Sequence, residues 1–298
     1  MKEGQTFVID ALPGVLPYYL KAMAPRPGIA NGDNIPATRV EWPSFRFSEA
    51  AVRAYAKACS WHMADDQQVP LYFPHSFFGP LHLLMLTERN FPLRVLGGLH
   101  LRNHIVQHRA LYPGTDYSAN LLFCAERCTP QGLEVDFRTE IKAEGALHWE
   151  SLTTFLFRTR CQSEDAPSKL ARAAEPLVDP QTFASFPVPA NTGKTFGRIT
   201  RDINPIHMSR WLAKAFGFER DLCHGMWALA RTQSEINGID YQAPVRSDAV
   251  FKGPLYMGRD ITLKADGDNV FHHELYSGDN DRPCVIARLM NVPADTTL

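Results

Sequence analysis

The stretch Thr200–His207, "TRDINPIH", places an acid, an amide, a proline and an imidazole close together. Asn204 followed by Pro205 predicts a helix start, because asparagine caps backbone N–H groups and proline is favoured at the first helical position. We expect the helix "PIHMSRWLAKAF" to end at Gly217, since glycine is a common C-terminal stop. The next question is whether this helix start also carries chemistry.

Asp202 lies on the chain that approaches the predicted helix, and His207 lies in its first turn. The turn can bring the carboxylate toward the imidazole, and together they can hold and activate one water molecule. Such clusters also begin many helices without any catalytic role. The following "CHGMW" favours chemistry, because Gly225 would then start an apolar helix with an unpaired N–H that can bind a substrate oxygen. The alternative for Gly225 is a simple turn glycine.

The order of predicted elements divides the chain into two similar halves. A stretch rich in proline, alanine and charge predicts a linker at residues 161–187. This linker would separate two domains, residues 1–160 and residues 188–298. The first half has an extended segment "TRVEWPSFRF", a helix from Ser48, a second helix after "FPHSFFGPLHLLMLT", and strands within 99–114, 118–128, 132–145 and 147–160. The second half has a segment "GKTFGRIT", the helix from Pro205, a second helix after "LCHGMWALART", and strands within 245–258, 260–267, 270–279 and 284–292.

Two local echoes support a tandem duplication. Pro74-His75-Ser76 and Cys223-His224-Gly225 each precede the second helix of their half, and Leu111–Gly114 and Leu255–Gly258 share a pattern in the following strand region. The pattern of elements in each half therefore predicts a curved antiparallel sheet wrapped around one long, buried apolar helix. The predicted fold class is α+β.

Composition excludes several classes of function. The formal net charge is −1, so we expect neither a nucleic acid nor an anionic membrane as partner. Prolines and charges interrupt the apolar run near the N-terminus, so we expect no signal peptide, and no apolar stretch approaches the roughly 20 residues of a membrane span. The scattered cysteines, Cys59, Cys124, Cys128, Cys161, Cys223 and Cys284, favour free thiols in a reducing cytoplasm.

Two other patterns suggest metal sites, and we favour the simpler interpretation of each. Cys124 and Cys128 have the spacing of half a zinc site, but no second pair follows. His100, His104 and His108 would share a face of a helix, yet their surroundings predict a strand, where such residues lie too far apart to share an ion. We therefore expect no metal.

The motif and its surroundings resemble a known family. "FGRITRDINPIHMSRWLAKAFGF" followed by "HGMWALAR" resembles the hydratase 2 motif of MaoC-like dehydratases, and the long leading half resembles the tandem, or double hotdog, members. The resemblance implies that Asp202 and His207 hold the water added to, or removed from, a 2-enoyl thioester. It also implies that Asn204 orders the turn and that the Gly225 N–H binds the thioester oxygen.

The chain departs from the family pattern in two places. Family members usually carry Ser-Gly before the aspartate, whereas this chain has Thr200-Arg201. Arg201 either pairs with Asp202 and lowers its basicity or contacts a charged group of the substrate. The first half has no matching acid and imidazole, so we expect one catalytic centre per chain, with the first half shaping the acyl pocket.

The expected activity is that of a hydro-lyase interconverting trans-2-enoyl and (R)-3-hydroxyacyl thioesters, the stereochemistry being implied by the resemblance. Candidate substrate-binding residues are Arg201, His224, Met226 and Lys252, although a solvated edge explains Lys252 equally simply. We expect no cofactor, CoA or acyl carrier protein as the substrate's handle, a role in fatty acid metabolism in the cytoplasm, and a homodimer as an option. The alternatives are a hotdog thioesterase and a non-catalytic acyl-thioester-binding protein, the latter favoured if Arg201 locks Asp202 in an ion pair.

Overall fold

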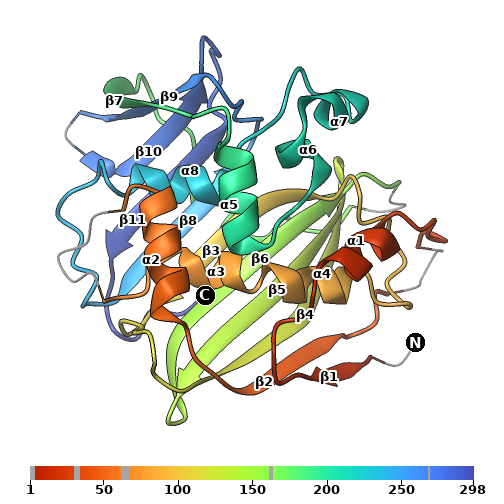
Figure 1. Cartoon of the computed structure of the whole chain (residues 1–298). Helices are drawn as coiled ribbons and strands as arrows, with labels where there is room; N and C mark the ends of the chain where they lie inside the picture. Colours follow the sequence, from red (N-terminus) through yellow and green to blue (C-terminus); the bar gives the residue numbers. More distant parts are fainter. Residues whose placement is uncertain (1–3, 30–33, 62–66, 161–163, 268) are drawn as a thin grey trace.

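The computed structural model describes residues 4–29, 34–61, 67–160, 164–267 and 269–298 (Figure 1). The strands of these residues form one continuous sheet of eleven, in the order β1-β2-β4-β5-β6-β3-β8-β11-β10-β9-β7. The first half contributes β1 (Thr6–Val8), β2 (Arg39–Phe45), β3 (Leu99–Gln107), β4 (Tyr117–Thr129), β5 (Gly132–Ala143) and β6 (Ala146–Phe157). The second half contributes β7 (Gln181–Pro187), β8 (Val245–Phe251), β9 (Asp260–Asp266), β10 (Asn269–Ser277) and β11 (Val285–Asn291).

The sheet order repeats itself outward from its centre. Reading away from the β3–β8 junction, the first half runs β3-β6-β5-β4-β2 and the second half runs β8-β11-β10-β9-β7. Each of these strands thus has a counterpart at the same place in the other half, whereas β1, which pairs with β2 at the edge of the sheet, has none. The halves join where β3 and β8 pair antiparallel, with Asn103 opposite Ala249. This confirms the tandem α+β fold, but the two predicted sheets are one continuous sheet.

Helices of both halves lie on one side of this sheet (Figure 1). They are α1 (Leu16–Ala22), α2 (Glu49–Ala58), α3 (Phe73–Phe77), α4 (Gly79–Leu86), α5 (Thr192–Thr200), α6 (Pro205–Met208), α7 (Arg210–Ala215) and α8 (Gly225–Thr232), with a single 3₁₀ turn at Lys169–Arg172. Six of the eight residues of α4 and six of the eight of α8 are buried. Their burial agrees with the expected apolar helix at the centre of each half.

Two predicted segments differ from the structure. Residues of "GKTFGRIT" form a helix, α5, and not an extended segment. The extended segment of the second half is β7, which lies inside the predicted linker and pairs with β9. Gly193 and Gly197 lower the helical propensity of the α5 sequence, but its buried positions Phe196 and Thr200 still follow helical spacing.

The predicted helices are also shorter than expected. The helix from Pro205 stops at Met208, because Ser209 is extended at φ −153° and ψ 128°, and α7 begins only at Arg210. In the first half the central helix divides into α3 and α4 at Phe78. Gly217, at φ +87°, follows the end of α7 as expected.

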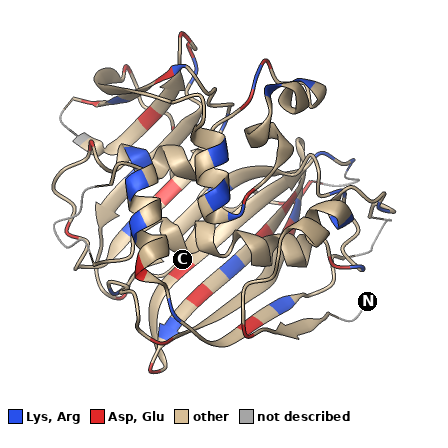
Figure 2. Ribbon diagram, viewed as in Figure 1, with Lys and Arg blue, Asp and Glu red and all other residues tan. Residues whose placement is uncertain are grey.

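Further predictions concern the cysteines, the membrane and the domain limits. Cys59, Cys124, Cys223 and Cys284 are free thiols, whereas Cys161 lies outside the described residues. In the described ranges, no helix combines the length and the apolar character that crossing a membrane requires. Figure 2 shows lysine and arginine residues on the outward faces of α2 and α5, opposite the sides that pack on the sheet. The limits of the linker stay a prediction.

Candidate active site

The turn before α6 folds as its sequence predicts. Asn204 caps the helix by accepting a hydrogen bond from the Ile206 N–H at 3.4 Å. Its own N–H donates to Asp202 Oδ1 at 3.1 Å, and its carbonyl accepts from the His207 N–H at 2.9 Å. Asn204 thereby fixes the positions of the acid and the imidazole on its two sides.

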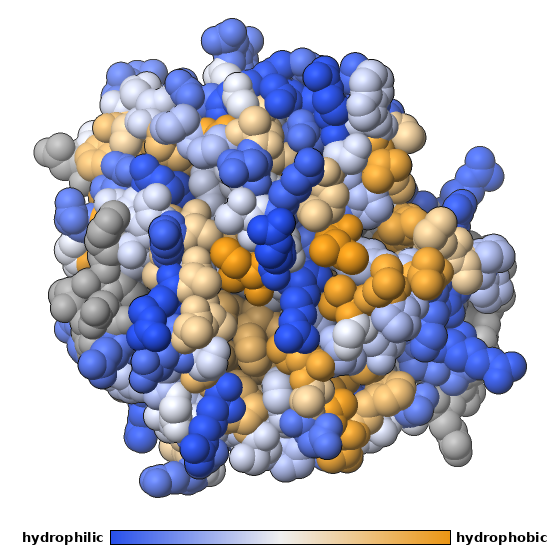
Figure 3. Space-filling model, in the orientation of Figure 1, coloured by the Kyte–Doolittle hydropathy of each residue, from blue (hydrophilic) through white to orange (hydrophobic). Residues whose placement is uncertain are grey.

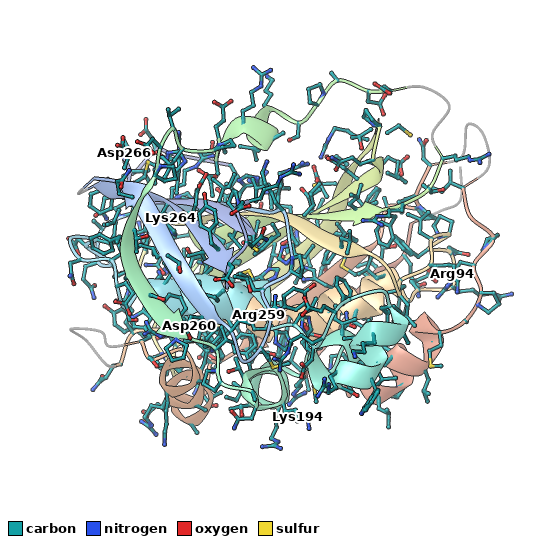
Figure 4. All side chains as sticks on the ribbon, turned by 90° about the horizontal axis from the view of Figure 1, so that it is seen from above. Arg94, Lys194, Arg259, Asp260, Lys264 and Asp266 are labelled. Carbon is teal, nitrogen blue, oxygen red and sulfur yellow. The ribbon has the colours of Figure 1, made fainter. Side chains whose placement is uncertain are left out.

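Helix α5 supports this turn through two glycines. A Cβ on Gly193 would lie 2.2 Å from the His207 carbonyl oxygen, and a Cβ on Gly197 would lie 2.5 Å from the Asp202 carbonyl oxygen. Both distances are too short for any side chain, so the glycines allow the turn to rest directly on the helix backbone. Lys194, on the other side of α5, points away from the molecule (Figure 4).

The Asp202 carboxylate is held by a residue from the far end of the chain. The Tyr19 hydroxyl, on α1, donates to Asp202 Oδ1 at 2.8 Å. The second oxygen, Oδ2, lies 3.5 Å from His224 Nε2, and the side chain remains 42% exposed. Burial raises the pKa of Asp202, but His224, His207 and Tyr19 outweigh it, and the net shift is below the ordinary value. The carboxylate is therefore ionised at neutral pH and has one oxygen available for a ligand.

His207 is oriented by a backbone bond. Its Nδ1 donates to the Leu222 carbonyl at 2.9 Å, which leaves Nε2 as the atom that accepts a proton or a hydrogen bond. The ring stacks on His224 with centroids 3.8 Å apart and planes tilted by 26°. Burial first, and then the neighbouring His207, lowers the pKa of His224 to about 3, so His224 is a neutral partner.

Gly225 begins α8 beside these groups. A Cβ at this position would lie 2.5 Å from Cε1 of Phe251, so the fold admits only glycine here without moving that ring. In the part of the chain that the structure describes, the Gly225 N–H has no hydrogen-bond partner. A free N–H at a helix N-terminus suits an oxygen that carries developing negative charge.

These groups line one cavity of about 300 Å³. Asp202, His207 and Gly225 contribute polar atoms, whereas much of the remaining wall comes from apolar residues of α4 and the neighbouring strands. Figure 3 shows apolar side chains around α1 and α4 on the same face of the molecule. A polar end in an otherwise apolar cavity suits a ligand with a reactive head and an acyl chain.

The candidate substrate-binding residues have different positions. Arg201, His224 and Met226 line the cavity. Arg201 is exposed, and within the described ranges it forms no salt bridge, so it does not lock Asp202. Lys252 is exposed and lies outside the cavity wall, which supports the solvated edge.

Sequence reasoning missed two groups of cavity residues. Tyr19 is separated from Asp202 by 183 positions, and no local pattern links them. His75, His82 and His100 line the cavity from the first half. The echo between His75-Ser76 and His224-Gly225 was the one available signal for His75, because equivalent positions of a duplicated fold face the same space.

A metal is the other ligand these groups suggest. One donor atom each from Asp202, His207 and His224 lies within 4.8 Å of the others. However, the two imidazoles stack on one another, and His207 Nδ1 is already bonded to the Leu222 carbonyl at 2.9 Å. His224 Nε2 also lies 3.3 Å from the Asp202 carbonyl, to which it donates. The geometry suits a water molecule better than an ion.

Comparisons with known proteins find related sequences and structures. Residues 173–266 match the family described as the MaoC like domain. The chain is 28% identical over 243 residues to 3-hydroxyacyl-thioester dehydratase X of Mycobacterium tuberculosis, covering 81% of this chain and 85% of that protein. The crystal structure of HtdX from the same organism superposes with a TM-score of 0.69 at 24% identity, covering 85% of this chain and all of that one (100%). A MaoC-like dehydratase from Phytophthora capsici has a TM-score of 0.66 at 15% identity, over 88% and 99% of the two chains.

The fold and the family match define a class: this is a double hotdog protein that carries a MaoC-like domain. Within that class, the chain is similar to MaoC-like dehydratases, and residues 173–266, which contain the D-x-N-P-x-H motif, match the MaoC like domain.

Proposed function

We propose that the protein is a hydro-lyase that adds water to a trans-2-enoyl thioester to give the (R)-3-hydroxyacyl thioester, or runs the reverse dehydration. One observation carries the proposal. Asp202 and His207 Nε2 lie at the same cavity as the free N–H of Gly225. This is the arrangement needed to hold a water molecule next to a polarised thioester.

The residues divide the reaction between them. Asp202 Oδ2 and His207 Nε2 accept hydrogen bonds from one water molecule, and Asp202 removes its proton as the oxygen attacks the β-carbon. The Gly225 N–H stabilises the enolate-like oxygen of the thioester. One of the acid and imidazole pair then returns a proton to the α-carbon. Tyr19, Asn204 and His224 act through Asp202, by fixing its orientation and keeping it ionised.

The two alternative functions fit the cavity less well. A non-catalytic binding protein was favoured if Arg201 held Asp202 in an ion pair, and the described residues contain no such pair. A thioesterase would also use a carboxylate and a helix N-terminus. It would not need an imidazole whose Nδ1 is bonded so that Nε2 remains available beside the acid.

The proposed reaction needs no metal or redox cofactor. CoA or acyl carrier protein is the handle of the substrate, and Arg201 is positioned at the cavity wall to meet a charged group of it. We therefore expect a chelator to leave the hydration rate unchanged, within about twofold, when it is measured after dialysis. A large loss, restored by one added metal ion, would assign that ion to Asp202, His207 and His224.

One assay separates the three functions. Purified protein is mixed with a short enoyl-CoA, and the conjugated double bond and the free thiol are followed together. A hydratase consumes the double bond without releasing thiol, a thioesterase releases thiol, and a binding protein does neither.

Asp202→Asn tests the acid itself. We expect its hydration rate to fall by about a thousandfold, since general base catalysis contributes factors of this order. Asp260→Asn is the matched control, because Asp260 is an exposed residue at the start of β9 (Figure 4). Wild-type hydration by a folded Asp202→Asn protein would disprove the mechanism.

We further propose that the protein acts in the cytoplasm in fatty acid metabolism. The free thiols of Cys59, Cys124, Cys223 and Cys284 support a reducing environment. Pairing of two chains into a homodimer is compatible with the fold, and size-exclusion chromatography with light scattering tests it.

A further inference from the structure

The cavity that contains Asp202 and His207 extends into the first half of the chain. There its wall includes three histidines, His75 of α3, His82 of α4 and His100 of β3. The mechanism above uses none of them.

A series of ring contacts connects the Gly225 end of the cavity to these histidines. Phe251 lies against Gly225, and its ring centroid is 4.6 Å from that of His100. The His100 ring lies 5.1 Å from His75, and His75 lies 5.4 Å from His82. Under the proposed function, the acyl chain of a thioester bound at Gly225 would extend along these histidines.

Hydrogen bonds fix the protonation of His75. The Asn103 amide NH₂ lies 3.1 Å from His75 Nδ1, and an amide NH₂ only donates, so Nδ1 accepts and the proton is on Nε2. Thr153 Oγ1 is 3.3 Å from the same nitrogen. In the described part of the chain, His75 Nε2 has no hydrogen-bond partner, so one N–H donor is available at the cavity.

His82 has a similar free atom. Its Nε2 pairs with Thr139 Oγ1 at 3.4 Å, and its Nδ1 has no partner among the described residues. Burial lowers the pKa of His82 to about 4, and burial together with the nearby imidazoles of His100 and His82 lowers the pKa of His75 well below its ordinary value. At neutral pH both rings are uncharged, so each offers a hydrogen bond rather than a charge.

The rest of this part of the wall is apolar. Leu83, Leu86, Phe155 and Phe157 line the cavity beside the imidazoles. A plain alkyl chain packs against these apolar side chains. However, it excludes water from His75 Nε2 and His82 Nδ1 and offers these two atoms no hydrogen bond in place of the water. An unpaired buried polar group is costly, so the wall discriminates against such a chain.

We infer that the preferred acyl chain carries a hydroxyl or carbonyl group, several carbons from the thioester, that hydrogen-bonds to His75 and His82. The inference rests on the proposed function for the orientation of the chain. A hydroxyl suits both rings, since it accepts from the His75 Nε2–H and donates to or accepts from His82 Nδ1.

The test compares octenoyl-CoA with octenoyl-CoAs that carry one hydroxyl at the terminal carbon or at one of the carbons before it. We expect at least one hydroxylated substrate to have a kcat/KM about tenfold above that of the plain chain, as one or two hydrogen bonds provide. The saturated octanoyl-CoA and its hydroxylated forms, measured by titration calorimetry, are expected to show the same preference in Kd.

Variants of the two histidines test whether these residues cause the preference for hydroxylated chains. His82→Leu and His75→Leu should each reduce the ratio between hydroxylated and plain substrates to about one, and His75→Gln should restore part of it by supplying an N–H. His273→Leu is the matched control, because His273 is also a buried histidine with a pKa lowered to about 4, but it lies outside the cavity. Its ratio should equal that of the wild type. Where His75→Leu does not fold, His82→Leu and the wild-type ratios decide.

The outcomes separate this inference from the proposed function. Equal kcat/KM for plain and hydroxylated chains at every position, or a preference that survives in both leucine variants, overturns the inference while the hydratase assignment stands. A calorimetric preference in a protein that hydrates no enoyl thioester supports the inference and refutes the proposed function.

Discussion

The two halves of the chain share a scaffold but differ at the two positions to which we assign the proposed chemistry. After α2, the backbone turns at Ser60, φ +52°, into buried Trp61, whereas after α5 it turns at Arg201, φ +60°, into Asp202. His75-Ser76, in α3 just before α4, stands where the second half has His224-Gly225 at the start of α8. A tryptophan and a serine of the first half thus stand where the second half has the proposed base and the proposed oxyanion donor.

Gly225→Ser sharpens this comparison most, because it gives the second half the serine of the first. The new Cβ would meet the Phe251 ring, displacing either the ring or the N-terminus of α8. We expect kcat to fall by about a hundredfold, the usual cost of losing an oxyanion donor. Steady-state kinetics measure it, and circular dichroism verifies the fold. Unchanged kcat would mean that Gly225 does not differ functionally from Ser76.

Gly197→Ala tests the support beneath the acid. Its Cβ would lie 2.5 Å from the Asp202 carbonyl oxygen, so the turn has to move away from α5. We expect a loss of hydration of about tenfold to a hundredfold, because small displacements of catalytic groups have effects of this size. Gly217→Ala is the control for an open glycine position, with strain at φ +87° but no contact, and activity should persist there.

Tyr19→Phe tests whether a residue of the first half affects the ionisation of Asp202, the proposed base. The Tyr19 hydroxyl helps to hold the pKa of Asp202 below its ordinary value, so its removal raises that pKa. Since the base works ionised and is lost as pH falls through its pKa, the acid limb of the kcat/KM profile should move to higher pH. Tyr18→Phe, one residue earlier on α1, should leave the limb in place. If the wild type, Tyr19→Phe and Tyr18→Phe all have the same acid limb in the kcat/KM profile, Tyr19 has only a structural role.

Arg201→Gly should have the smallest effect of these four substitutions. The property it changes is the stability of the folded protein. Arg201 holds a left-handed conformation that glycine adopts without strain, which explains why the family usually carries glycine there. We expect the free energy of unfolding to rise by about 0.5–1 kcal/mol, measured by denaturant titration. Arg198→Gly, inside α5, should instead lower it by about 1 kcal/mol. Equal effects of both changes would contradict the assignment of strain to position 201.

The sequence predicted the parts of this molecule that depend on near neighbours. Strand patterns, the Asn204 cap and the spacing from Asp202 to His207 are local, and the structure reproduces them. Helix α5 was mistaken for an extended segment, because its glycines serve a contact with the turn that no local pattern displays. The stop at Ser209 was also missed, since nothing in "PIHMSRWLAKAF" breaks helical spacing there.

The remaining site residues come from distant parts of the chain. The bond between Tyr19 and Asp202 joins the first and second halves, and such a contact leaves no periodicity in a single sequence. His75, His82 and His100 belong to segments whose burial could be predicted, but the cavity they share with Asp202 depends on how the two halves pack. Long-range packing is therefore the part of the site that the motifs did not specify.

The antiparallel junction between β3 and β8 has a consequence for how this protein can change. In an assembly of two identical chains, every substitution appears twice, so a change that improves one face of the cavity also alters the other. Here both faces are encoded once, in a single reading frame. Ser76 and Gly225 can therefore mutate independently, and selection for a new acyl chain can act on the first half while the machinery of water addition stays constant.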